Sequence, residues 1–297
     1  METIDSALEL QPKADEQFQA LSYKASVLLS LHQFEKALGV AEKAVQINPH
    51  NAQIYGALVD APVELGNSAE AVKMADKMVS IRPDLRSYSR VSYLREIYGE
   101  KQGAIEAMEM AVKAGLPGTE EAAWARLNLG GLYYKNGDTA MAEAQYQRIL
   151  AERPNYPFAI AAQAQIAADK GEFEQAEILL NTAIELIPEV GFYQQLAAIY
   201  QNTGREKEKE KTVSEMLLML KDDEAQGHNM GLAYAELHLE LSHNYAEALK
   251  YANEEYAARP QNSEVNTMLA KVYAKMGRAE EAEKHLKKAT IGMNVSG

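Results

Sequence analysis

The 297-residue sequence contains no cysteine. This absence excludes disulfide bonds, thiolate nucleophiles and zinc sites built from cysteine ligands. The sequence also lacks an apolar run of membrane-spanning length, and its acidic first ten residues do not resemble a secretory signal. We therefore expect a soluble chain with no membrane span, in the cytoplasm or the periplasm, and these features do not decide between the two compartments.

Basic residues are in the minority. Lys and Arg number 30 against 43 Asp and Glu, which gives a formal net charge of −13. A surface of that charge repels nucleic-acid phosphates and anionic lipid headgroups. A protein or a peptide is therefore the expected partner, and nucleic acid is not.

The common catalytic motifs are also missing. The sequence has no GxxxxGK[ST] phosphate loop, no HExxH pair and no GxSxG elbow. The best metal candidate is the ExxH spacing of Glu240 and His243 near His238. A di-iron bundle needs that motif twice and two further carboxylates, so a metal-binding protein around His238 and His243 is only a minor alternative. We predict a protein that is not an enzyme, with no cofactor, no catalytic residues and no metal site.

What the sequence does contain is a repeat. Hydrophobic residues make up 47% and charged residues 25%, which suits helices, and the length exceeds what one hydrophobic core usually supports. A proline stands twelve residues after five of the repeat positions, and a glycine stands five residues before six of them. The repeat positions, 33 to 39 residues apart, are Ala37, Ala71, Ala104, Ala142, Ala176, Lys209, Ala248 and Ala282.

Each repeated residue has a physical role in a helical hairpin. Glycine adopts positive φ and ends the first helix, proline stops the second, and the small alanine lets the two helices approach. One hairpin cannot cover its own apolar face, so successive hairpins stack. The pattern predicts an all-α solenoid of about eight helix-turn-helix repeats as a single domain over residues 18–290. Residues 1–17 are expected to be the remnant of a preceding repeat and residues 291–297 a C-terminal tail.

Two features are expected to interrupt this regularity. The connection between the sixth and seventh units should be the longest irregularity, with a lengthened closing helix whose start, REKEKEK at 205–211, is solvated. Pro62 falls inside a first helix, where it cannot donate to the Leu58 carbonyl, so we expect a kink or a break there.

The fourth unit carries a family resemblance. It contains Leu129, Gly130, Tyr133, Gly137, Asp138, Ala142, Tyr146 and Pro154 at the spacing of the tetratricopeptide repeat family, which the chain resembles. A segment over 87–99 resembles one found in bacterial repeat proteins of unassigned function. The resemblance implies an α-α superhelix that binds partners in a concave groove lined by the first helix of each unit. The polar helix that commonly covers the last apolar face in this family is not evident after the eighth unit, so we expect that self-association through the ends is possible.

By the same resemblance, the third and fourth first-helices carry the ligand contacts. Arg86, Arg90 and Tyr93 stand at i, i+4 and i+7 on the third, and Trp124, Asn128, Tyr134 and Lys135 take matching places on the fourth. Arginine forks and tyrosine hydroxyls suit an acidic or carboxylate-bearing segment. The alternative is that both arginines pair with neighbouring carboxylates of the chain itself.

The function expected from these features is a protein-protein interaction scaffold, with a peptide or a partner helix in the groove. A second possibility is an architectural subunit of a bacterial cell-envelope or secretion assembly that uses the ends of the solenoid. The sequence identifies neither the partner nor the biological process.

Overall fold

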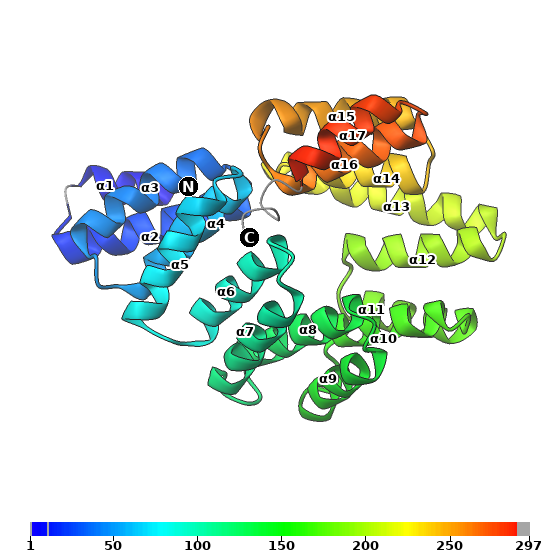
Figure 1. Ribbon diagram of the computed structural model, residues 1–297, viewed down its shortest axis with the longest axis horizontal. Helices are drawn as coiled ribbons and strands as arrows, with labels where there is room; N and C mark the ends of the chain where they lie inside the picture. Colours follow the sequence, from blue (N-terminus) through cyan, green and yellow to red (C-terminus); the bar gives the residue numbers. More distant parts are fainter. Residues whose placement is uncertain (1, 11, 290–297) are drawn as a thin grey trace. The chain divides into compact units, whose positions relative to one another are not determined.

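The computed structural model describes residues 2–10 and 12–289, and over these residues it is built from 17 helices without a strand. A short first helix, α1 (Glu2–Glu9), precedes eight hairpins, which confirms the predicted number (Figure 1). The predicted tail, residues 291–297, lies outside the described residues. The hairpins are α2 (Ala14–Ser30) with α3 (Phe34–Ile47), α4 (Ala52–Glu64) with α5 (Ser68–Ile81), α6 (Leu85–Ile97) with α7 (Lys101–Ala114), α8 (Glu120–Lys135) with α9 (Thr139–Glu152), α10 (Pro157–Asp169) with α11 (Phe173–Leu186), α12 (Val190–Asn202) with α13 (Glu206–Ala225), α14 (Gly231–Glu240) with α15 (Tyr245–Ala258) and α16 (Ser263–Lys275) with α17 (Ala279–Ala289).

A left-handed residue closes the first helix of every hairpin. The fourth hairpin shows how: Gly137 has φ 85°, and the side chain of the next residue, Asp138, caps α9 by accepting from the Met141 N–H. The same place is taken by glycine in six hairpins. In the first and seventh hairpins it is taken by His32 and His243, at φ 56° and 52°. His243, a residue of the minor metal alternative, thus has a backbone role in a turn.

The repeat positions lie in the cores of the hairpins. Six of the seven alanines have no exposed surface, and Ala282 in the last hairpin is half-buried. Lys209, in the sixth hairpin, is only 8% exposed, and its ammonium reaches the Glu206 carboxylate at 2.5 Å. The prediction that 205–211 is a solvated segment is therefore wrong at Lys209, because the repeat register turns this residue toward the partner helix.

The two predicted irregularities come out differently. α13 is indeed lengthened, to 20 residues. The connection that follows it, residues 226–230, is no longer than residues 115–119 between α7 and α8, so the irregularity lies in the helix. Pro62 does not break α4, which continues to Glu64. Pro62 deprives only the Leu58 carbonyl of its donor, and the single missing hydrogen bond does not end the helix; a bend stays a prediction.

The chain packs as two compact units, and one of them is discontinuous. The first consists of Met1–Ala107, Gly227–Asn229 and Ala252–Gly297, and the second of Met108–Gln226 and Met230–Tyr251. The core of the first unit includes Phe18, Leu21, Ile54, Leu58 and Met78. In the second unit, Met216 and Leu220 of α13 pack with Tyr234 and Leu237 of α14. The partly buried Leu217 packs against the same cluster, so the apolar run 216–220 contributes to the core through three of its residues.

None of the described helices combines the length and the apolar character that crossing a membrane requires.

Candidate partner-binding surfaces

The third first-helix, α6, carries three of the predicted contact residues on one face. Asp84 caps this helix by accepting from the backbone N–H groups of Arg86 and Ser87. Its buried side holds Leu85, Ser87, Ser89, Ser92 and Leu94. Arg86 and Tyr93 are exposed and Arg90 is half-buried, so the predicted stripe faces away from the core.

Arg90 is already paired within the chain. Its Nε and Nη2 donate to the two carboxylate oxygens of Asp60 at 2.8 and 2.6 Å, and its Nη1 donates to the Arg86 carbonyl. The guanidinium lies over Gly56, one turn before Asp60 on α4, where a β-carbon would stand 2.8 Å from Nη2. A carboxylate ligand would have to displace Asp60 from this bidentate pair. The observed pair agrees with the alternative that Arg90 binds a carboxylate of the chain itself. The docking of an acidic segment at Arg90 stays a prediction.

Tyr93 lies in acidic surroundings. Its side chain is 41% exposed. Partial burial, together with the carboxylates of Glu264, Glu64, Glu96 and Asp60, raises the pKa of its hydroxyl above the usual range. Four carboxylates near one phenol favour a hydrogen-bond donor or a cation as the group that meets it, and disfavour another carboxylate.

The fourth first-helix, α8, carries the other four predicted contact residues. Trp124 is 44% exposed, and the Asn128 side-chain amide donates to the Trp124 carbonyl at 2.8 Å. Tyr134 is half-buried and Lys135 is exposed. The opposite face holds Leu129 and Tyr133 in the core. The surface of α8 thus combines an indole, an amide, a phenol and one ammonium group.

The structure distributes these residues over both units. Arg86, Arg90 and Tyr93 belong to the first unit, and Trp124, Asn128, Tyr134 and Lys135 belong to the second. The predicted site is therefore two surfaces, each held by one helix, which we call the α6 surface and the α8 surface.

The histidines of the minor metal alternative have other surroundings. His238 stacks on Tyr251 with ring centroids 5.9 Å apart, and burial lowers the pKa of its imidazole. Nδ1 of His243 lies 3.4 Å from the Leu239 carbonyl. Among the described residues, no three His, Cys, Asp or Glu side chains are grouped so as to hold a metal ion.

Comparison with known families decides the class of the chain. Two family models, both described as tetratricopeptide repeat, match it: one over residues 28–96 and 232–291, the other over residues 99–157. Together these ranges cover well over half of the sequence. The chain belongs to the tetratricopeptide repeat family.

A curated relative of this tetratricopeptide repeat protein is the cellulose synthase operon protein C of Pseudomonas fluorescens strain SBW25. The two are 25% identical over 158 residues, which is 50% of this chain but only 12% of that protein. The matched half of the chain thus corresponds to about an eighth of the relative's length.

Solved structures share the fold. The Cut9–Hcn1 hetero-tetramer of the APC/C matches with a TM-score of 0.59 and 17% identity, over 91% of this chain and 48% of that chain. PilF of Pseudomonas aeruginosa matches with a TM-score of 0.55 and 15% identity, over 70% of this chain and 94% of that chain. The human IFIT1 dimer with PPP-AAAA matches with a TM-score of 0.55 and 14% identity, over 92% of this chain and 72% of that chain. At these identities the likeness concerns the fold alone.

Two groups of residues in the repeat protein were missed by sequence reasoning. One is a set of lysines on α2 and α3, of which Lys36 and Lys43 share a helix face by their spacing of seven. That spacing could have indicated a basic helix face from the sequence alone. The other is the contact of Arg259 with Glu64, which are 195 residues apart. No local pattern could have indicated this second pairing.

Proposed function

We propose that this tetratricopeptide repeat protein is a non-catalytic scaffold that binds peptide segments or helices of other proteins at each of two surfaces, the α6 surface and the α8 surface. The observation that carries the proposal is the exposure of Tyr93 on α6 and of Trp124 on α8. Large aromatic side chains contribute strongly to binding when a partner buries them, and they are enriched among the residues that dominate interfaces.

The two surfaces differ in the partner groups that they suit. On α8, the ammonium of Lys135 and the hydroxyl of Tyr134 suit a carboxylate, and Trp124, about three helical turns away, suits an apolar group. On α6, the acidic surroundings of Tyr93 suit a donor or a cation. Arg90 binds Asp60, and Arg86 stands in the first turn of the helix. A partner of the α8 surface is therefore expected to carry a carboxylate, and a partner of the α6 surface a donor or a cation.

Affinity capture with two matched variants tests the proposal. The double variant Tyr93→Ala/Trp124→Ala should lose the proteins that the wild-type chain retains from a lysate of its source organism, as quantified by mass spectrometry. Tyr23→Ala, at a 68% exposed tyrosine on α2, is the control and should retain them. An unchanged set of captured proteins in the double variant, with the helical circular dichroism preserved, would refute the role of these surfaces.

A second candidate function is that of an architectural subunit in a bacterial cell-envelope or secretion assembly. It is supported by the name of the curated relative and by the fold likeness to PilW, described as a type IV pilus biogenesis factor, with a TM-score of 0.55 and 17% identity. In this function the last hairpin would make the contacts, and Leu286 on α17 is 53% exposed. Leu286→Glu should then abolish capture while Tyr93→Ala/Trp124→Ala leaves it intact.

A further inference from the structure

An open cavity of about 570 Å³ lies among the first three helices. These helices are neighbours at the start of the chain, drawn in blue in Figure 1. Its apolar part is formed by Leu28 of α2, by Leu31 directly after that helix and by Val40 of α3. Lys24, Lys36 and Lys43 line it as well, together with Asp5, Gln33 and Gly39. A cavity of this size accommodates one or two bulky side chains of a ligand.

The charge of this cavity is opposite to that of the chain. Three lysines and one carboxylate line it, in a sequence with a net charge of −13. Lys24 is paired with Asp5. The Lys36 ammonium donates to the Gln33 side-chain oxygen at 2.9 Å, and in the described part of the chain neither Lys36 nor Lys43 forms an ion pair. Two positive charges beside an apolar wall are therefore left without a carboxylate.

Gly39 keeps this cavity open. It lies in the interior of α3, where glycine costs about 1 kcal/mol relative to alanine. No close packing requires it, because a β-carbon built at Gly39 would meet no heavy atom within 4 Å. Nor does a left-handed backbone require it, since Gly39 is not among the glycines with positive φ. A side chain at this position would instead project into the space that Lys36, Val40 and Lys43 line.

We propose that the cavity binds an acidic amphipathic helix of a partner protein. On α3, Lys36, the Gly39–Val40 pair and Lys43 stand at i, i+3/i+4 and i+7, which is one helix face about 10 Å long. A partner helix with carboxylates at i and i+7 and a leucine-sized residue at i+4 repeats this spacing. Its carboxylates meet Lys36 and Lys43, and its apolar side chain enters the cavity against Leu28, Leu31 and Val40. The inference rests on the proposed scaffold function and adds to it a binding site and a partner chemistry.

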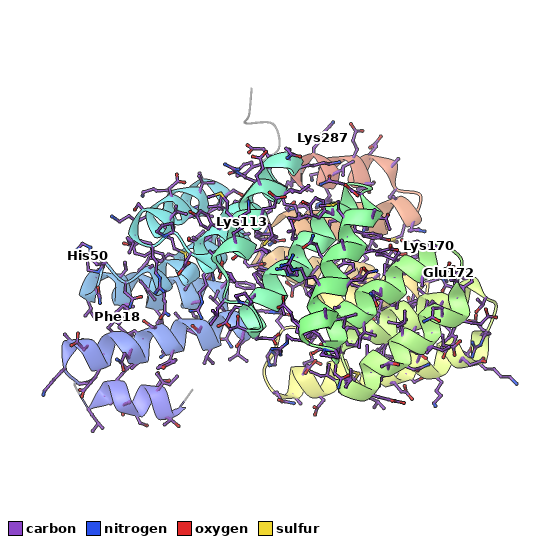
Figure 2. The ribbon with its side chains drawn as sticks, turned by 90° about the horizontal axis from the view of Figure 1, so that it is seen from below. Phe18, His50, Lys113, Lys170, Glu172 and Lys287 are labelled. Atoms are coloured by element: carbon purple, nitrogen blue, oxygen red, sulfur yellow. The ribbon has the colours of Figure 1, made fainter. Side chains whose placement is uncertain are left out.

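The test uses a fluorescein-labelled, alanine-rich helical peptide with Glu, Leu and Glu at i, i+4 and i+7, and fluorescence anisotropy. Wild-type protein should bind it, and the same peptide with Gln in place of Glu should bind at least about threefold more weakly. Lys36→Glu/Lys43→Glu and, separately, Gly39→Leu should each lower the affinity about tenfold or more, a change of about 1.4 kcal/mol. The control Lys113→Glu/Lys207→Glu changes the net charge equally at two exposed lysines, the first of which is labelled on α7 in Figure 2, and should alter the affinity less than about twofold.

Gly39→Leu should fold, because leucine is a better helix former than glycine; the lysine variants test the site independently. The proposal is overturned if the Glu and Gln peptides bind equally, if no binding occurs up to about 1 mM (a free energy of about −4 kcal/mol), or if Gly39→Leu binds like wild type. It is also overturned if decanoate binds in the cavity and the peptide does not, since a small anionic amphiphile would then be the ligand.

Failure of this inference can be told from failure of the scaffold proposal. Tyr93→Ala/Trp124→Ala should bind the peptide like wild type if the cavity is a separate site. Captured proteins that are lost from that variant and kept by Gly39→Leu would leave the scaffold proposal standing and remove the cavity inference.

Discussion

At the scale of single residues, Gly130 and Tyr146 show why the repeat motif needs its particular residue types. A β-carbon at Gly130 on α8 would stand 2.3 Å from the Tyr146 ring, which is 4% exposed. The glycine is therefore required by the close approach of α8 and α9. Its neighbour Gly131 has no such contact, because a β-carbon there would meet nothing within 4 Å.

These two glycines make a matched pair of substitutions. Gly130→Ala should lower the free energy of unfolding by about 1–3 kcal/mol, because the buried Tyr146 ring must move. Gly131→Ala should raise it by up to about 1 kcal/mol, because alanine is the better helix former. Urea titration followed by circular dichroism measures both. If Gly130→Ala also raised the free energy of unfolding, α8 and α9 would have to be further apart than described.

At the scale of helices, the first unit is joined by a buried ionic cluster at the ends of α4 and α15. Arg259 is 7% exposed and Glu255 3%. The Arg259 guanidinium donates to the Glu255 carboxylate and, at 2.5 Å, to that of Glu64. Asn262 donates to the Glu64 carbonyl at 2.9 Å. Close to this cluster, a β-carbon at Gly66 would stand 2.4 Å from the backbone of Gln261, so the two turns are tightly packed.

We predict that Arg259→Met destabilises the protein by about 3 kcal/mol, because it leaves two largely buried carboxylates without their cation. The matched change is Arg278→Met, which removes an arginine from a half-exposed pair with Glu281 and should cost less than about 1 kcal/mol. Equilibrium urea unfolding provides both values. Equal effects of the two substitutions would show that the cluster is solvated.

At the scale of the whole molecule, the net charge of −13 opposes the binding of nucleic acid. We expect no binding of a labelled 20-nucleotide RNA or of a DNA duplex tighter than about 0.1 mM in anisotropy titrations at 50 mM NaCl, because too few cations are present to replace phosphate counterions. Affinity that falls steeply with added salt would contradict this expectation.

The candidate surfaces were only partly predictable from the sequence. The helical period correctly placed Arg86, Arg90 and Tyr93 on one outward face of α6. It could not indicate that Asp60, thirty residues earlier, supplies both oxygens to Arg90. Pairing of that kind depends on the separation and rotation of two packed helices, which a one-dimensional period does not contain. The lysine cavity was missed for the same reason, since its lining comes from three helices.

The sequence by itself determined the number of hairpins, the turns between their helices and the buried small residues. These features depend on local conformational preference and on contacts between neighbouring segments, which a repeat encodes directly. Only the tertiary structure decided which charges are free. The sequence around Arg90, Lys209 and Arg259 does not show that each of these cations pairs with a carboxylate. Nor does it show that Lys36 and Lys43, among the described residues, form no such pair. The physical reason is that an ion pair forms over a few ångströms in space, and residues 195 positions apart, such as Glu64 and Arg259, reach that distance only through folding.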